Sequence, residues 1–449
     1  MQTVSGLEKT LLKTLDMQVP IYRWKEASPL DKERILRRSG EDVARFEEDA
    51  RRIIQEVRQN GDRALVEQAR RFDAADLSGL GIRVSAAEIE KAVQRLDPAV
   101  KAAIDRSYAN IGRFHESQMP EQYWWMEVVP GVFAGEKISA IESVGLYVPR
   151  GTAAYPSVML MLGVPAAVAG VKRIVAVSPP CKDGSVDDGT LYVAHKVGVA
   201  EVFRMGGAGA VAALALGTET VRRVLKIVGP TNIYGAAAKK ILYGQIDVGT
   251  PAGPSEAIIL ADDSVPAGLV AADLLIEAEH GPYSAALLVT PHDRLAHQVA
   301  QLVPMLIHEL PEKQQEYITR VLTNYGGIVL VDSIDEACEF VNEYAPEHLE
   351  VLTHDPHALL GKLVNAGEIM LGKYTPISLC NFSVGVNAIL PTGGRAKTSS
   401  VVTVHDFLKR TSVSYVTKEG FVSLKECVKT FATFEGFPAH ARALDARDV

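Results

Sequence analysis

A carboxylate and an imidazole stand side by side in the segment Tyr344-Ala-Pro-Glu-His-Leu-Glu350. Pro346 fixes its own φ angle and biases Ala345 away from the helical region, so we expect Glu347 and His348 at the start of an element. Such a pair supplies a base that can polarise water and a group that exchanges a proton near neutral pH. It is equally typical of a helix N-terminus, where a glutamate suits the helix dipole. The segment alone leaves both interpretations open.

A second pair lies in the segment Leu274-Leu-Ile-Glu-Ala-Glu-His-Gly281. Its apolar residues define one face of a predicted helix. Glu277 and His280 are three positions apart and share a face at the end of that helix. A carboxylate and an imidazole in this arrangement can bind a metal ion, and they can equally form an ion pair within the helix.

Three further polar residues are ambiguous when each is taken alone. Asn381 is typical of a turn, and His440 is typical of a surface histidine near a chain end. Arg395 follows two glycines in Pro391-Thr-Gly-Gly-Arg395, where a guanidinium could bind a carboxylate, phosphate or sulfonate through two parallel hydrogen bonds.

These residues must be positioned by two series of short β-rich segments that alternate with alanine-rich helical segments. The first series runs from about residue 143 to 232, and the second from about 257 to 353. This alternation predicts an α/β fold with parallel, doubly wound sheets, and the repetition indicates two similar domains. Residues 31–120 are helical in pattern, and residues 1–16 have the pattern of an amphipathic helix.

Ligands of such sheets bind at the carboxyl ends of the strands. Two glycine- and proline-rich turns follow predicted strands of the first series, at Gly145–Gly151 and at Gly229–Asn232. Neither turn is a GxGxxG or a Walker motif, so a binding role and a simple tight turn are both open.

Composition excludes several classes of function. The 449 residues carry a net charge of −8 without a basic run, so nucleic acid is not an expected partner. No apolar stretch has the length of a membrane span or the form of a signal peptide. The four cysteines are far apart in the sequence, so we expect reduced thiols in a cytoplasmic protein. They are Cys181, Cys338, Cys380 and Cys427.

Ten ordered segments resemble the histidinol dehydrogenase family, and the resemblance runs from about residue 30 to the C-terminus. They are Gly145-Leu-Tyr-Val-Pro-Arg-Gly151, Ala154-Tyr-Pro-Ser157, Val164-Pro-Ala-Ala-Val-Ala-Gly170, Gly206-Gly-Ala208, Ala212-Ala-Leu-Ala-Leu-Gly-Thr-Glu219, Gly229-Pro-Thr-Asn232, Ala252-Gly-Pro-Ser-Glu256, Ala278-Glu-His-Gly-Pro282, Ala345-Pro-Glu-His-Leu349 and Leu390-Pro-Thr-Gly-Gly394.

The resemblance implies two related Rossmann-like domains with small N- and C-terminal helical extensions. It also implies zinc and NAD as cofactors and a homodimer with intertwined subunits. The expected division is an N-terminal extension (1–30), a discontinuous α/β domain that carries the Glu-His pair (31–128 with 256–402), an NAD-binding domain (129–255) and a C-terminal dimerisation tail (403–449).

Family members oxidise an amino alcohol through an aldehyde to a carboxylate in two hydride transfers. The resemblance therefore implies that Glu347 activates water and that His348 is the general acid and base. Tyr147 and Asn232 match positions that contact NAD. Ser255 and Glu435 match positions near the substrate.

The sequence departs from the family at the metal and substrate positions. Where the family has Gln, His, Asp and His as zinc ligands, this chain has Glu277, His280, Asn381 and His440. The exchange keeps one carboxylate, one amide and two imidazoles, so the donors for zinc remain.

Two further positions differ. Ala388 replaces a histidine that meets the substrate, and Gly209 replaces a glutamine that helps to hold NAD. The loss of a carboxylate at Asn381 and of the histidine at Ala388 argues against L-histidinol. We therefore expect another small primary alcohol, with Arg395 binding an anionic group. One candidate is 2,3-dihydroxypropane-1-sulfonate, oxidised to 3-sulfolactate as by a sulfopropanediol 3-dehydrogenase. The alternatives are a genuine L-histidinol dehydrogenase and a non-catalytic paralogue.

Overall fold

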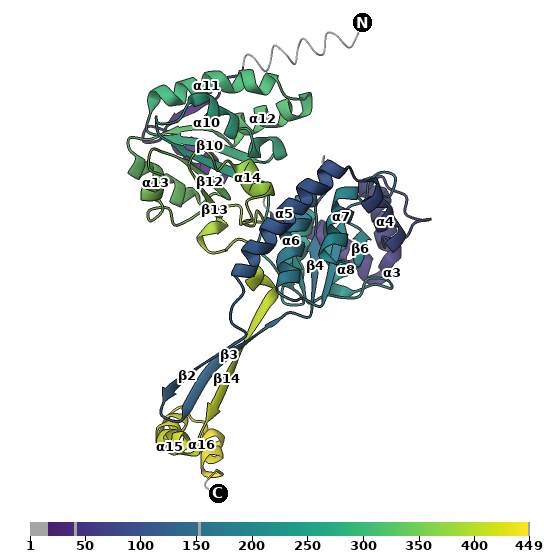
Figure 1. Cartoon of the computed structure of the whole chain (residues 1–449), viewed down its shortest axis with the longest axis vertical. Coiled ribbons are helices and arrows are strands. Elements are labelled where there is room, and N and C mark those ends of the chain that lie inside the picture. Colours follow the sequence, from purple (N-terminus) through teal and green to yellow (C-terminus); the bar gives the residue numbers. More distant parts are fainter. Residues whose placement is uncertain (1–16, 40–42, 151–153, 448–449) are drawn as a thin grey trace.

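A computed structural model describes residues 17–39, 43–150 and 154–447, so the helix predicted for residues 1–16 lies outside the described residues. Two α/β lobes carry a long arm that projects away from both (Figure 1). The two large sheets are parallel, which confirms the predicted α/β class. Among the described residues no helix is long and apolar enough to cross a membrane. All four cysteines are free thiols.

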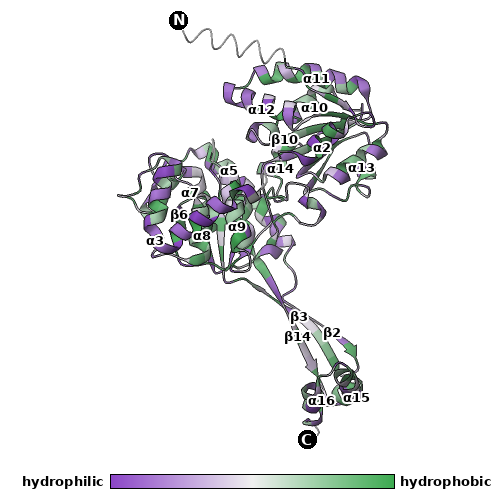
Figure 2. Ribbon diagram, turned by 180° about the vertical axis from the view of Figure 1, so that it is seen from behind, coloured by the Kyte–Doolittle hydropathy of each residue, from purple (hydrophilic) through white to green (hydrophobic). Residues whose placement is uncertain are grey.

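The first lobe, here the five-stranded lobe, has the strand order β6-β5-β4-β7-β8. The strands are β4 (Ser143–Tyr147), β5 (Arg173–Ser178), β6 (Glu201–Arg204), β7 (Lys226–Val228) and β8 (Asp247–Val248). One face is covered by α3 (Glu47–Asp73), α8 (Gly207–Leu216) and α9 (Ile233–Leu242). The other face is covered by α4 (Ala86–Arg95), α5 (Pro98–Ser117), α6 (Pro156–Val168) and α7 (Asp188–Val197). Helix α8 is hydrophobic along nearly its whole length (Figure 2) and is buried between the sheet and its neighbouring helices.

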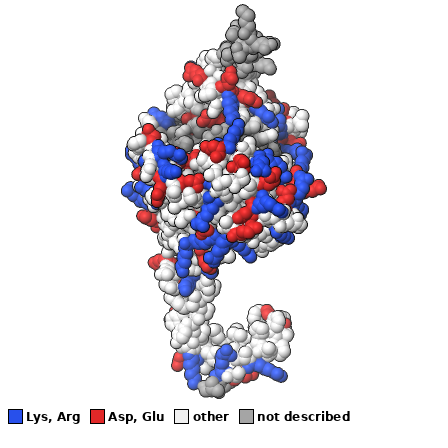
Figure 3. Space-filling model, turned by 90° about the vertical axis from the view of Figure 1, so that its right-hand side faces the viewer, with Lys and Arg blue, Asp and Glu red and all other residues white. Residues whose placement is uncertain are grey.

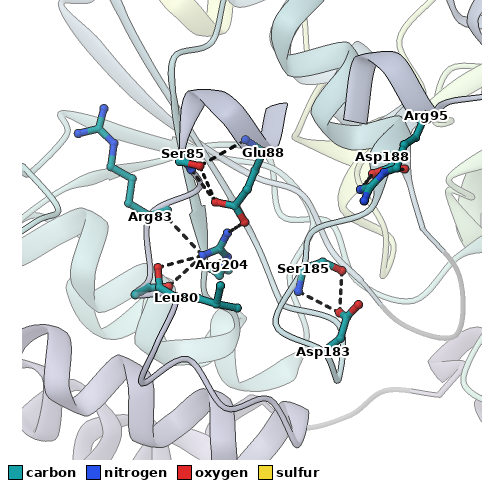
Figure 4. Close-up of polar contacts among 10 residues, drawn as sticks. Leu80, Arg83, Ser85, Glu88, Arg95, Asp183, Ser185, Asp188 and Arg204 are labelled. Carbon is teal, nitrogen blue, oxygen red and sulfur yellow. Dashed lines mark hydrogen bonds and ion pairs between the residues drawn. The ribbon is translucent and has the colours of Figure 1, made fainter. Parts of the chain in front are cut away.

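The helices α3, α4 and α5 correct the expected domain division, which grouped residues 31–128 with 256–402. They pack on the five-stranded sheet instead. Arg204, fully buried at the end of β6, donates to the backbone carbonyls of Leu80, Gly81 and Arg83. Its guanidinium also pairs with Glu88 at the start of α4 (Figure 4). A buried guanidinium needs these acceptors, so the ion pair fixes this helical segment to the five-stranded lobe.

The six-stranded lobe has the parallel strand order β1-β11-β10-β9-β12-β13. The strands are β1 (Ile21–Arg23), β9 (Glu256–Ala261), β10 (Ala285–Thr290), β11 (Gly327–Leu330), β12 (His348–Leu352) and β13 (Glu368–Leu371). Helices α10 (Ala267–Asp273), α11 (Asp293–His308) and α12 (Glu312–Asn324) cover one face, and α2 (Pro29–Arg37) and α13 (Ile334–Tyr344) cover the other. The predicted extension 1–30 thus contributes an edge strand to this sheet.

The arm consists of β2 (Tyr123–Val129), β3 (Val132–Ala140), β14 (Leu408–Val416), α15 (Lys418–Phe434) and α16 (Pro438–Asp445). Strand β3 pairs antiparallel with both β2 and β14. The expected boundary at residues 128 and 129 therefore cuts β2, and the tail 403–449 holds a nine-residue strand as well as helices. The shaft of the arm shows few charges on the face in Figure 3. All seven residues of β2 are exposed, including Trp124, Trp125 and Met126.

Candidate active site

The Glu347-His348 pair lies between the end of α13 and the start of β12. Ala345 ends the helix in the left-handed conformation, with φ 53°, and Pro346 separates it from the strand. The pair therefore stands at the start of a strand, which agrees with the expected start of an element. The alternative interpretation, in which the pair begins a helix, is wrong. Both side chains are buried. They lie at the amino edge of the six-stranded sheet, where the loop before β9 also arrives.

Glu347 is held by a backbone hydrogen bond, because the N–H of Glu256 donates to its Oε2 at 2.9 Å. Burial raises the pKa of Glu347 to about 8, although the neighbouring His348 opposes that shift. A carboxylate destabilised in this way is a stronger base than an exposed one, which suits it to accept a proton from water.

His348 lies among three carboxylates. Its Nε2 is 3.9 Å from Glu277 Oε1 and 3.9 Å from Glu347 Oε1, and its Nδ1 is 3.5 Å from Glu368 Oε2. Burial by itself lowers the pKa of this imidazole, but the three acids outweigh it and raise the pKa to about 9. The ring is thus a strong proton acceptor at the edge of the site.

The second predicted pair lies directly beside the first. Glu277 and His280 occupy a 3₁₀ turn after α10, with Glu277 Oε2 and His280 Nδ1 3.0 Å apart. Asn381, on the short helix α14 (Ile377–Phe382), donates from Nδ2 to Glu277 Oε1 at 2.8 Å. Ser255 Oγ lies 3.0 Å from His280 Nδ1. Burial raises the pKa of Glu277, but the two histidines and the hydrogen bonds reverse the effect and lower it to about 2.

This set fits a zinc ion in the chemistry of its donors: a carboxylate, an imidazole and, in Asn381, an amide oxygen that the hydrogen bond to Glu277 leaves uncommitted. It is one ligand short of a tetrahedral site. Across the described residues no group of three or more His, Cys, Asp or Glu side chains has the geometry of a metal site. The fourth predicted ligand, His440, lies on α16 at the far end of the arm (Figure 1), so one chain does not bring it to the other three.

The predicted cofactor residues meet at the carboxyl edge of the five-stranded sheet. The strand order reverses between β4 and β7, and Tyr147 ends β4 while Asn232 follows β7 and caps α9. The N–H of Gly207, at the start of α8, donates to Tyr147 Oη at 2.7 Å. A reversal point flanked by two helix N-termini is where doubly wound sheets bind dinucleotides.

Close packing against helix α3 explains why position 209 is a glycine. A Cβ atom there would lie 1.9 Å from the side-chain oxygen of Gln68, a buried residue of α3. A larger residue at position 209 therefore cannot enter unless Gln68 moves.

The remaining substrate candidates are dispersed within one chain. Arg395 is exposed on a 3₁₀ turn after the Gly393-Gly394 loop. Ala388 is half-buried and packs against the core of the five-stranded lobe. Glu435 is exposed at the end of α15 on the arm, close in sequence to His440.

Neighbouring contacts hold the two lobes together at α14. Asn110 of α5 donates to the carbonyl of Ser383 at 2.7 Å, and Asn387 donates to the carbonyl of Met161 in α6 at 2.6 Å. The segment that follows Asn381 is thereby attached to the five-stranded lobe, and α14 lies on the side of the six-stranded lobe that faces it (Figure 1).

Sequence reasoning missed Glu256 and Glu368. Glu256 is buried, accepts from the N–H of Gly393 at 2.7 Å and pairs with Arg38 at 3.4 Å. Glu368 faces His348 from the neighbouring strand. In the sequence, each glutamate could be seen as an acid at the first position of a predicted apolar strand. Its neighbours can be identified only when the strand register is known.

Known proteins of one family are similar to almost the whole chain. The family model described as histidinol dehydrogenase matches residues 36–448. A histidinol dehydrogenase from Synechocystis sp. is 48% identical over 95% of this chain and 99% of its own length. A "histidinol dehydrogenase homolog" from Rhizobium meliloti is 46% identical over 95% of this chain and 94% of its own. The crystal structure of a histidinol dehydrogenase from Elizabethkingia anophelis is 32% identical, with a TM-score of 0.88 over 96% of this chain and 98% of its own. The chain therefore belongs to the histidinol dehydrogenase family.

Proposed function

We propose that the protein is a zinc- and NAD-dependent dehydrogenase of the cytoplasm that oxidises a small primary alcohol through an aldehyde to a carboxylate. The observation that carries this proposal is the buried Glu347-His348 pair, whose imidazole lies 3.9 Å from Glu277 in the candidate metal set. The family is one of NAD-dependent oxidoreductases that act twice on a CH–OH group. A non-catalytic paralogue has no reason to keep two buried acids and an imidazole in this arrangement.

The two residues divide the chemistry. Oxidation of the alcohol releases the hydroxyl proton, and His348 Nε2 faces the site to accept it. Oxidation of the aldehyde requires addition of water, and Glu347 is the base for that step because burial raises its pKa to about 8. When bound, NAD accepts each hydride and zinc polarises the substrate oxygen. Glu277, His280 and Asn381 would hold the zinc, and Tyr147 and Asn232 would border the NAD.

We further propose that the active unit is a homodimer with intertwined arms. His440 and Glu435 are exposed and far from the other candidates within one chain, and β2 presents an exposed aromatic face. In a dimer, His440 of a second copy would supply the fourth metal ligand. The test mixes two inactive variants, Glu347→Ala and His440→Ala. Subunit exchange should restore about a quarter of the wild-type sites, and no recovery would place His440 outside a shared site.

The substrate we propose is not L-histidinol but an alcohol with an anionic end group, such as 2,3-dihydroxypropane-1-sulfonate. Asn381 donates its amide to Glu277, so no carboxylate stands at this position to bind a cationic amine. Ala388 offers no imidazole, while Arg395 offers an exposed guanidinium on the neighbouring loop.

A genuine L-histidinol dehydrogenase is the second candidate. Its support is the relative from Synechocystis sp., whose name is histidinol dehydrogenase and whose identity of 48% is similar to the 46% of the relative named a homolog.

One assay separates the candidates. NADH formation is measured with the zinc-loaded enzyme and L-histidinol, sulfonated and carboxylated diols, or amino alcohols. Two NADH per sulfonated diol and little turnover of L-histidinol would support the proposal. Efficient turnover of L-histidinol alone would establish the second candidate. No NADH with any alcohol, in a protein without stoichiometric zinc, would contradict both.

A further inference from the structure

We propose that Glu368 is a positioning residue for the general base: its carboxylate fixes the orientation and tautomer of His348, so that Nε2 faces the reacting alcohol. The catalytic consequence rests on the proposed function, whereas the tautomer itself does not.

The sheet register brings the two residues together. His348 and Glu368 are direct neighbours on the parallel strands β12 and β13. Neighbouring residues of adjacent strands point to the same face of a sheet. Each of these residues is the first of its strand, so both side chains stand at the edge where Glu347 is also found. Close approach of this edge depends on Gly367, whose N–H donates to the carbonyl of Pro346.

The facing atoms are His348 Nδ1 and Glu368 Oε2, which are 3.5 Å apart. The side chain of His348 is 3% exposed and that of Glu368 is 9% exposed. Both atoms are buried, and neither has a hydrogen-bond partner elsewhere in the part of the chain that the structure describes. A buried N–H and a buried carboxylate oxygen are costly when unpaired, so each is the natural partner of the other.

The opposite side of the ring faces the site. Nε2 is the atom near Glu277 Oε1 and Glu347 Oε1, both at 3.9 Å. An ionised carboxylate only accepts hydrogen bonds, so Glu368 favours the tautomer with the proton on Nδ1. Nε2 then carries the lone pair that accepts a proton from the substrate. A carboxylate that orients a catalytic imidazole in this way commonly changes the rate by much more than it changes binding.

Helix α14 also brings a residue, Cys380, beside Glu368. Burial raises the pKa of the Cys380 thiol, and the neighbouring Glu368 carboxylate raises it further. Cys380 lies in the small cluster formed by Ala257, Met370 and Ile377.

The test compares three variants that differ in what they present to Nδ1. Glu368→Leu removes the acceptor, Glu368→Gln keeps a neutral acceptor, and Glu350→Gln is the matched control. Glu350 is buried on the same face of β12, two residues beyond His348, next to Asp273 instead of the imidazole. The first measurement is the ¹⁵N chemical shift of the two imidazole nitrogens in histidine-labelled protein, assigned with His348→Asn. The second is the steady-state kinetics of NADH formation.

At a pH above 9, where the imidazole of His348 is neutral, we expect the wild type, Glu368→Gln and Glu350→Gln to show His348 protonated at Nδ1, and Glu368→Leu to shift it toward the Nε2-protonated form. With substrate, kcat of Glu368→Leu should fall by about 10- to 100-fold while KM stays within about twofold, and Glu368→Gln should recover most of kcat.

An unchanged tautomer together with an unchanged kcat in folded Glu368→Leu overturns the proposal. If that variant fails to fold, Glu368→Asp decides in the same way, because it withdraws the carboxylate from Nδ1 and should produce the same shift. The nitrogen shifts need neither substrate nor cofactor, so they give a result even if every alcohol fails. A shifted tautomer with no turnover in the wild type would retain the positioning of His348 and reject the proposed reaction.

Discussion

The backbone N–H of Glu256, the first residue of β9, donates a 2.9 Å hydrogen bond to Oε2 of Glu347. The side chain of Glu256 is tied at the same time to Arg38 and to the N–H of Gly393. One strand start therefore anchors the Glu347 carboxylate and the loop that carries Arg395. The other oxygen of Glu347 is left near His348.

Because of this hydrogen bond, Glu347→Gln tests whether Glu347 activates water without removing the contact of its side chain with Glu256. The amide oxygen of glutamine can still accept from the N–H of Glu256, so the fold should persist, but an amide cannot take a proton from water. The first oxidation should continue, and the second should slow by about 10²-fold or more. The number of NADH molecules formed per substrate should fall from two toward one. The aldehyde should then accumulate, and a hydrazine reagent should trap it. Glu343→Gln, at an exposed site on α13, is the control. Equal loss of both oxidations would contradict the role.

The hydrogen bond between Asn381 and Glu277 predicts a coupled exchange. Asn381→Asp alone places two carboxylates at the site of a 2.8 Å hydrogen bond, so it should weaken zinc binding or shift the pKa of one acid upward. Adding Glu277→Gln restores one amide and one carboxylate in reversed order. The double variant should bind zinc more tightly than Asn381→Asp, by about tenfold, in a competition titration with a chelator. Additive losses in the double-mutant cycle would show that the pair does not act as a unit.

Gly367 allows two strand starts to approach closely. A Cβ atom at this position would lie 2.6 Å from the backbone carbonyl of Glu347, which cannot rotate away. Gly367→Ala should therefore lower the free energy of unfolding by about 1–3 kcal/mol and reduce kcat by displacing Glu347. Gly361→Ala is matched to it, because no atom lies within 4 Å of the added methyl. Denaturant unfolding of both variants checks the difference, and equal effects would refute it.

Glu350 predicts a pH dependence of stability. Burial, and then the neighbouring Asp273, raise its pKa to about 9 from an ordinary 4.5. Between these two values the folded chain keeps a proton that the unfolded chain has released. The contribution of Glu350 to stability is therefore fully present below pH 4.5 and is lost as the pH rises toward 9, by up to about 1.4 kcal/mol per pH unit. Glu350→Gln removes this slope, so its stability relative to the wild type should increase from pH 5 to pH 8. A constant difference would show that Glu350 is ionised in the folded state.

The sequence predicts the local part of the site well, because Glu277 and His280 are three residues apart and Glu347 and His348 are adjacent. Asn381 reaches Glu277 across 104 residues, and only the family resemblance indicated it beforehand. Glu368 was missed because its meaning depends on the register of β13 against β12. The helices α3 to α5 show the same limit. Their periodicity predicts an apolar face but does not specify which of two similar sheets will cover it.

The arm also has a consequence for how the protein is made. Arg410 of β14 and Glu136 of β3 are paired although 274 residues separate them. At a synthesis rate of about 5–20 residues per second, β2 and β3 leave the ribosome roughly 15–55 s before their third strand exists. During that interval the edge of β3 that β14 later pairs with is open, which is the state in which strands join to strands of other chains. A chain that stops before residue 408 would keep this edge permanently, so truncated products should aggregate through the arm even when both lobes have folded.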